Sequence, residues 1–128
     1  MNFNDYANLD AIGVSTAINQ GEVSAQEVTE KAIEVAERMN AELNALVITN
    51  YDNARTFVAG ELPDTPVAGA PFYLKDVNQF SHDMPTTFSC RFFDGVSPRE
   101  DSELVKRWRQ AGLVFLGKTN TPEFAEDF

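Results

Sequence analysis

Apolar residues recur along the chain in two patterns, one typical of helices and one of short buried strands. Helical spacing predicts four helices, over residues 10–20, 24–39, 51–59 and 102–111. The second has the clearest start, because Ser24 and Glu27 form a capping box in which each side chain satisfies the other's free backbone N–H. Asp101 is the expected N-cap of the fourth helix, and Gly112 its expected end.

Three short apolar runs predict strands, over residues 45–50, 71–77 and 113–116. They alternate with the helices, so the predicted fold class is α/β. Because the runs are almost continuously apolar, we expect a mixed, mostly buried sheet covered on both faces. Three strands are too few for a full sheet of this kind. Residues 1–128 are therefore predicted to be the N-terminal fragment of a single larger domain, with an incomplete sheet.

The connectors differ in length. Residues 61–70 and 117–124 are short and marked by glycine or proline, whereas 78–100 is too long for an idle connection and is expected to carry function. This long loop contains the phenylalanines Phe80, Phe88, Phe92 and Phe93. They suit either an apolar wall for a substrate or an ordinary core, and the sequence leaves both interpretations open.

Composition narrows the class of protein. A net charge of −10 repels nucleic acid and anionic membranes, so neither is an expected partner. The single cysteine, Cys90, allows no intrachain disulfide and fits a reducing compartment. No apolar run reaches the length of a membrane span, and the first residues lack the pattern of a signal peptide. A soluble cytoplasmic protein is predicted.

The most unusual residue is Lys75, a cation within the apolar run "GAPFYLKDV". A lysine acts as a base only when neutral, and lowering its pKa from about 10.4 to near 7 costs about 4 to 5 kcal/mol. Burial among aromatic neighbours would supply this shift, which makes Lys75 a candidate catalytic base. The alternative is a surface lysine with its ammonium in water or paired with a carboxylate such as Asp76.

Two other motifs offer chemistry. His82 and Cys90, eight residues apart, could form a thiol nucleophile with its base, although the spacing does not require it. "GLVFLGKT", residues 112–119, fits the letters of a phosphate-binding loop, but its four intervening residues are those of a predicted strand. A metal site is not expected, because one histidine and one cysteine offer no ligand cluster. No cofactor is predicted.

Several segments together resemble the amidase signature family in order and spacing. They are "GEVSAQEV", "LNALV", "GAPFYLKDV", "MPTTFSC" and "DSELVKRWRQAGLVFLGKTNTPEF", which cover nearly the whole chain. The resemblance implies an amide-bond hydrolase acting on non-peptide linear or cyclic amides, nearest to the cyclic-dimer hydrolase and general amidase branch. It also implies that Lys75 is the lysine of the family's Ser, cis-Ser, Lys triad, in which a bridging serine relays the proton of a nucleophilic serine.

The chain departs from the family pattern in its serines. The family's Gly- and Ser-rich segment follows the "GKTN" block, and no serine here matches its positions; the serines present are Ser15, Ser24, Ser81, Ser89, Ser97 and Ser102. This fragment is therefore expected to be inactive alone, and to self-associate or pair with a missing C-terminal part. The alternatives are a non-catalytic amidase-like module that binds a partner through its uncovered core, and a fragment of a glutamine amidotransferase A-type subunit.

Overall fold

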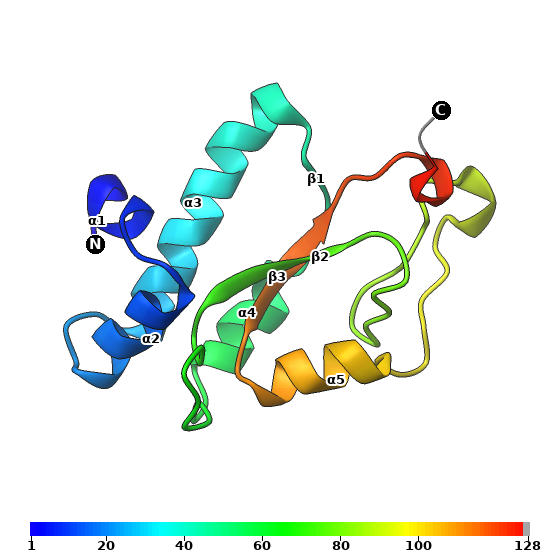
Figure 1. The fold of residues 1–128 in the computed structure, drawn as a ribbon. Helices are drawn as coiled ribbons and strands as arrows, with labels where there is room; N and C mark the ends of the chain where they lie inside the picture. Colours follow the sequence, from blue (N-terminus) through cyan, green and yellow to red (C-terminus); the bar gives the residue numbers. More distant parts are fainter. Residues whose placement is uncertain (127–128) are drawn as a thin grey trace.

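The structure is a computed structural model that describes residues 1–126, with helices on both faces of a small sheet (Figure 1). Its α-helices are α1 (Phe3–Ala7), α2 (Ala11–Asn19), α3 (Ala25–Leu43), α4 (Tyr51–Val58) and α5 (Glu103–Gln110). Its strands are β1 (Leu46–Thr49), β2 (Pro71–Lys75) and β3 (Val114–Thr119), and its 3-10 helices are η1 (Arg91–Phe93) and η2 (Glu123–Ala125).

The sheet has the strand order β1-β3-β2. The central strand β3 runs parallel to β2 and antiparallel to β1, so the sheet is mixed. The carboxyl ends of β2 and β3 therefore lie at the same edge, and the long loop after β2 and the segment after β3 leave the sheet there (Figure 1). The predicted α/β class is confirmed.

The helix signals in the sequence correspond to real caps. The Glu27 backbone N–H donates to Ser24 Oγ at 3.1 Å, and Glu27 Oε2 accepts from the Ser24 backbone at 2.9 Å, which confirms the capping box. Helix α3 continues to Leu43, beyond the predicted end at residue 39, and stops at Asn44 in the left-handed region. Helix α1 was not predicted, because five residues are too few to show a periodicity.

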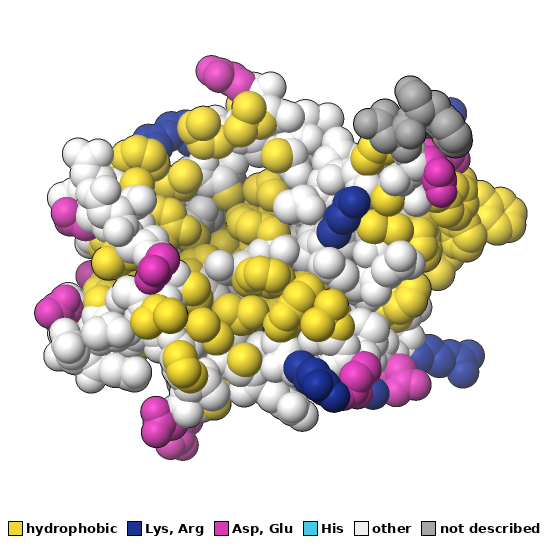
Figure 2. Space-filling model, in the orientation of Figure 1, with side chains coloured by type: hydrophobic (Ala, Val, Ile, Leu, Met, Phe, Trp, Pro, Cys, Tyr) yellow, Lys and Arg dark blue, Asp and Glu magenta, His cyan; other side chains and the backbone are white. Residues whose placement is uncertain are grey.

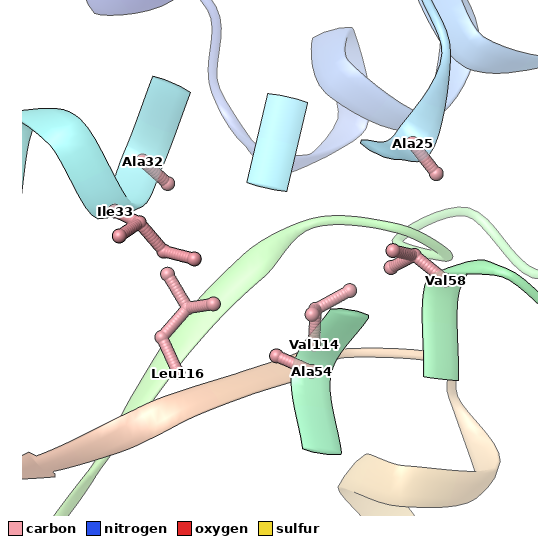
Figure 3. Close-up of a cluster of buried hydrophobic side chains, with 7 residues drawn as sticks. All are labelled: Ala25, Ala32, Ile33, Ala54, Val58, Val114 and Leu116. Atoms are coloured by element: carbon pink, nitrogen blue, oxygen red, sulfur yellow. The ribbon is translucent and has the colours of Figure 1, made fainter. Parts of the chain in front are cut away.

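The two faces of the sheet pack against different helices. On one face, Val114 and Leu116 of β3 contact the apolar stripes of α3 and α4. Figure 3 shows this cluster, formed by Ala25, Ala32, Ile33, Ala54, Val58, Val114 and Leu116. On the other face, Phe115 and Leu74 pack with Val105 of α5. Each fully buried aliphatic side chain stabilises the fold by about 1.5–3 kcal/mol, so these contacts dominate the packing energy.

Within residues 1–126 the strands are not equally covered, as expected for a sheet that is incomplete in this chain. Residues of β3 are buried through Lys118, whereas β1 alternates half-buried and exposed residues, and Val47 is 44% exposed. Strand β2 is fully buried only at Leu74. Outer strands have a neighbour on one side only, which explains why the central strand alone is enclosed.

Strand β3 is longer than predicted and includes the "GKT" residues assigned to a loop. Gly117 and Lys118 pair with β1 on one side and β2 on the other, so residues 112–119 do not form a phosphate-binding loop. A Cβ atom at Gly117 would lie 2.1 Å from the carbonyl oxygen of Ile48. Glycine is required here because the backbone of β1 approaches so closely.

The start of α5 also differs from its prediction. Ser102, rather than Asp101, occupies the N-cap position, and its side chain makes no capping hydrogen bond. The Asp101 carboxylate is instead engaged by Arg109 and His82. Gly112 follows the C-cap Ala111 with φ +80°, as expected for a glycine that ends a helix. Within residues 1–126, no helix has the length and apolar character needed to cross a membrane.

Candidate functional site

Lys75 is the last residue of β2, and its side chain is exposed. Of the two alternatives left open for Lys75, the structure has the surface lysine with its ammonium in water and not the lysine buried among apolar neighbours. Successive side chains of a strand point to opposite faces, and the adjacent Leu74 and Asp76, both fully buried, take the enclosed face. Lys75 therefore projects from the opposite face. Its backbone N–H donates to Gln79 Oε1 at 2.6 Å, which fixes the turn that follows the strand.

Asp76, the carboxylate considered as a possible partner of Lys75, pairs with a different lysine. Its carboxylate accepts a hydrogen bond from the Thr87 backbone N–H at 2.9 Å and another from the Thr87 hydroxyl. Its ionic partner is Lys118, with 4.0 Å between Nζ and Oδ1. Lys118 also donates to the Thr86 hydroxyl, and both charged side chains are 0% exposed. Asp76, Thr86, Thr87 and Lys118 form what is called the buried polar cluster below.

Lys118 has the buried environment that was considered as one alternative for Lys75. Burial lowers the pKa of Lys118 to about 8, although the Asp76 carboxylate acts in the opposite direction. Lys118 pairs with Leu74 across the parallel ladder, which places it on the enclosed face. The signal that could have found it is the strand register: continuing the "LVFL" strand by two residues gives Lys118 a strand position.

A second polar cluster ties the long loop to α5. The Arg109 guanidinium donates to Asp101 Oδ2 at 2.8 Å, to Asp83 Oδ1 at 3.2 Å and to Ser81 Oγ at 2.9 Å. Burial alone would raise the pKa of Asp101, but hydrogen bonds from Arg109 and His82 lower it to about 2. The same balance raises the pKa of Arg109, because the hydrogen bonds from its guanidinium outweigh desolvation. This cluster holds the loop in place.

The structure does not bring His82 and Cys90 together as a nucleophile and its base. His82 Nδ1 lies 2.7 Å from Asp101 Oδ1, and no hydrogen bond joins it to Cys90 within residues 1–126. In the same part of the chain, no three His, Cys, Asp or Glu side chains converge as metal ligands would.

Five phenylalanines gather at the carboxyl edge of β2 and β3. They are called the phenylalanine cluster and comprise Phe80, Phe88, Phe92, Phe93 and Phe124. Phe88 is the hub, with ring centroids 6.0 Å from Phe80, 5.3 Å from Phe93 and 5.7 Å from Phe124. Four of these residues were expected together in the long loop. Phe124 was not, because it comes from the segment after β3, and a contact between distant segments has no local signal in the sequence.

An apolar groove lies on the face from which Lys75 projects. It has a volume of about 230 Å³ and is lined by the second half of α3, the start of β1 and Tyr73 of β2. Figure 2 shows apolar side chains gathered in the hollow between α3 and β2. Met39 and Leu43 of α3 are 44% and 62% exposed there. The described residues leave this face of the sheet partly uncovered.

Comparisons with known proteins place these observations in a family. The sequence model of the Amidase family matches residues 27–127. The 6-aminohexanoate-cyclic-dimer hydrolase of Paenarthrobacter ureafaciens is 37% identical over 116 residues, which cover 89% of this chain and 23% of the relative. The A-type subunit of the glutamyl-tRNA(Gln) amidotransferase from Salinispora arenicola (strain CNS-205) is 39% identical over 129 residues, covering 94% and 26%.

Solved structures agree with this relationship. The structure of a 6-aminohexanoate cyclic dimer hydrolase superposes with a TM-score of 0.83 at 34% identity, covering 91% of this chain and 24% of that chain. The chain thus spans about a quarter of the length of the relatives it matches, corresponding to their N-terminal portion. With most of its residues matched by the family model and its fold shared with solved members, this chain belongs to the Amidase family.

Proposed function

We propose that this chain supplies the lysine of a Ser, cis-Ser, Lys amide hydrolase, and that Lys75 is that lysine. The observation that carries the proposal is its place: Lys75 ends β2 at the carboxyl edge, and its side chain is exposed on the incompletely covered face. An exposed amine there can meet groups from another part of the protein. Lys118 is enclosed and cannot.

In the proposed mechanism, Lys75 accepts a proton through a bridging serine as a nucleophilic serine attacks the amide carbonyl. The lysine then returns the proton to the departing amine, and water releases the acid from the acyl-enzyme. The lysine must be neutral when it accepts the proton. No serine of this chain is proposed for either role.

We further propose that residues 1–128 do not hydrolyse amides by themselves and act as part of a longer chain, or paired with its remainder, inside the cell. The apolar groove beside α3 supports this, because Met39 and Leu43 expose apolar surface that further polypeptide would cover. The isolated chain is expected to turn over a simple anilide or ester no faster than its Lys75→Ala variant. Turnover abolished by that substitution would contradict the proposed inactivity.

The role of Lys75 is best tested in a chimera. This chain would replace the matching N-terminal quarter of the cyclic-dimer hydrolase from Paenarthrobacter ureafaciens, and hydrolysis of the cyclic dimer would be measured. Lys75→Ala and Lys75→Arg are both expected to abolish kcat, because arginine keeps the charge but cannot become neutral at working pH. Lys106→Ala, at another exposed lysine, is the matched control and should leave kcat unchanged. An active Lys75→Arg chimera would refute a proton-accepting role.

The amidotransferase branch is a second candidate, because the relative from Salinispora arenicola is 39% identical to this chain. In that case the amide substrate would be glutamine, as a source of ammonia. Two chimeras separate the two candidate functions. In each, this chain replaces the matching N-terminal part of one relative, either the cyclic-dimer hydrolase or the amidotransferase subunit, and both glutamine and the cyclic dimer are tested as substrates. Hydrolysis of glutamine alone would favour the amidotransferase branch.

A further inference from the structure

We propose that Gln79 is a positioning residue for Lys75. Its side chain holds the backbone at the end of β2, so that the lysine leaves the sheet in one direction. This inference rests on the proposed function, since it adds to the same site a residue that acts through Lys75. Gln79 is not proposed to touch a substrate or a reacting atom.

The first support is that both peptide groups next to the Lys75 Cα are held by hydrogen bonds. In the peptide before it, the Lys75 N–H donates to Gln79 Oε1 at 2.6 Å. The carbonyl of the same peptide, from Leu74, accepts from the Thr119 hydroxyl at 3.3 Å. In the peptide after it, the Asp76 N–H donates to the Thr119 carbonyl at 3.1 Å. The orientations of these two peptide planes determine φ and ψ of Lys75, so the bonds together fix the direction of its Cα–Cβ bond.

Gln79 supplies the one bond of this set that β3 cannot. Strand β2 is an outer strand, with β3 on one side only (Figure 1). Backbone groups of successive strand residues point to opposite sides, and the Asp76 N–H points to β3, so the Lys75 N–H points away from the sheet. At the edge of a sheet such an N–H has no strand partner, and a strand end without partners frays easily. The side-chain carbonyl of Gln79 takes the place of a neighbouring strand.

The sequence after Lys75 is suited to bringing Gln79 back to the strand. Asn78 lies in the turn with φ of 57°, and asparagine tolerates this left-handed conformation better than most residues other than glycine. Gln79 is anchored in turn by the residue that follows it, because the Phe80 carbonyl accepts from the Ser102 N–H at 3.0 Å. The glutamine is therefore attached to the start of α5, which makes it a firm support for the strand end.

The direction of Lys75 matters for the proposed chemistry, because a base acts only within hydrogen-bonding distance of its partner. Misplacing a catalytic group by about 1 Å can lower the rate on the order of a hundredfold. Lysine has a long flexible stem, so a mobile backbone would add to the many positions that its amine already reaches. Loss of the Gln79 bond should therefore lower kcat and leave KM almost unchanged, because Gln79 does not bind the substrate.

Nuclear magnetic resonance of the isotopically labelled chain tests whether Gln79 holds Lys75. The order parameter of the Lys75 amide should be about 0.85, as for rigid backbone, in the wild type and in Gln79→Glu, which keeps an acceptor oxygen. In Gln79→Met, which has a similar size but no such oxygen, it should fall below about 0.6. Unchanged order parameters in α3 and β3 would show that the variants remain folded.

The matched control for this measurement is Asn40→Ala. Asn40 makes the same kind of contact at the opposite edge of the sheet, where the Leu46 backbone N–H donates to Asn40 Oδ1 at 2.8 Å. Removing that contact should leave the order parameter of the Lys75 amide unchanged. An equal fall in Asn40→Ala and Gln79→Met would mean that the whole sheet loosens, which would overturn the specific role of Gln79.

The effect on catalysis is measured in the chimera with the cyclic-dimer hydrolase. Gln79→Met should lower kcat by about 10- to 100-fold, with KM changed by less than about twofold. Gln110→Met, the same substitution at an exposed glutamine of α5, should leave both constants unchanged. Equal losses of kcat in the two variants would contradict the proposal.

Two further outcomes would overturn the positioning role. One is a Lys75 amide that is as ordered in Gln79→Met as in the wild type. The other is a Gln79→Met chimera with full kcat when Lys75→Ala abolishes turnover. An active Lys75→Arg chimera, or a chimera that hydrolyses nothing, would count against the proposed function instead. In either case the order parameters would still decide whether Gln79 holds Lys75 in place.

Discussion

Two lysines at the same end of the sheet have opposite environments. Lys75 ends β2 within an apolar stretch of sequence, yet its ammonium is exposed. Lys118 lies in β3 within the polar "GKTN" block, yet it is 0% exposed. The partners across the ladder are Leu74 with Lys118 and Lys75 with Thr119, so neighbouring positions on each strand point to opposite faces.

The comparison shows that sequence neighbours are a poor guide to the burial of a strand residue. Lys118 contacts Asp76 and Thr86, which lie 42 and 32 positions away in sequence. Both partners belong to the long loop after β2, so these contacts stabilise that loop. Lys75 has no such enclosure among residues 1–126. One lysine thus serves the structure, and the other remains available for chemistry.

The largest effect is expected from Asp76→Ala. It removes the acceptor for two hydrogen bonds from Thr87 and leaves the Lys118 charge buried without its partner. Breaking a buried charge pair in this way costs about 3–5 kcal/mol. The free energy of unfolding would be measured with urea, followed by the fluorescence of Trp108. Asp52→Ala is the control, because that carboxylate is fully exposed. A loss below about 1 kcal/mol for Asp76→Ala would contradict the structural role of the cluster.

The second prediction concerns the stability contributed by Lys118 as pH changes. Its pKa is lowered to about 8 in the folded chain from the ordinary 10.5, so the unfolded chain binds this proton more tightly. Stability should therefore rise as pH increases from about 8 to 10.5, by roughly 3 kcal/mol at about 1.36 kcal/mol per pH unit. Below pH 8 the penalty for burying the charged form is fully present.

The measurement for Lys118 compares the wild-type chain with Lys118→Met, since tyrosines and the other lysines titrate alike in both. The difference between their unfolding free energies should shift in favour of the wild type across this range. A difference that stays constant from about pH 7.5 to 10.5 would mean that Lys118 is not desolvated as the structure places it.

The third prediction concerns the Arg109 cluster, whose contribution to stability also rises with pH, but in the acid range and because the charged form of Asp101 is the favoured one. The pKa of Asp101 is lowered to about 2 from 3.8, so its contribution is present above pH 3.8 and is lost as pH falls through about 2. Asp101→Asn should cost roughly 2 kcal/mol at pH 7 and almost nothing near pH 2. Glu103→Gln, at an exposed carboxylate on the same helix, should show little effect at either pH. Equal losses for Asp101→Asn at both pH values would rule out a charge-based contribution.

The elements that the sequence predicted well are those determined by local chemistry. The Ser24 and Glu27 capping box depends on residues three apart, and the glycine that ends α5 depends on its own φ. The end of β3 was missed because glycine and lysine in "GKT" are poor local signals for a strand. They are strand residues because β1 and β2 bond to them on both sides, and neither contact is encoded nearby.

The residues of the candidate site could be named from the sequence, but whether each side chain is buried or exposed could not. Lys75 and four of the clustered phenylalanines were recognised from their positions in the sequence. Which lysine is buried depends on the register between β2 and β3, and the fifth phenylalanine, Phe124, depends on a backbone contact with Phe88. Both are relations between segments far apart in the chain. Propensity and periodicity describe single segments, so they could not supply either relation.

The smallest effect on stability is expected at Lys75. Lys75→Ala should change the free energy of unfolding by no more than about 0.5 kcal/mol, because the side chain is exposed and has no ionic partner among residues 1–126. Chemical modification should instead distinguish the two lysines strongly, with Lys75 reacting faster than Lys118. In the folded chain, an amine-reactive acetylating reagent should modify Lys75 as fast as the exposed Lys106, and Lys118 on the order of a hundredfold more slowly.

Peptide mapping by mass spectrometry would measure the two rates, and the same reagent in urea should remove the difference. Rapid modification of Lys118 in the folded chain would show that the buried polar cluster opens readily, which would also weaken the assignment of Lys118 to structure. Slow modification of Lys75 would mean that other polypeptide, such as a second copy of this chain, covers the face from which it projects. If Lys75→Ala leaves the free energy of unfolding unchanged, as expected, a difference in the rate at Lys75 cannot come from unfolding and reports on access.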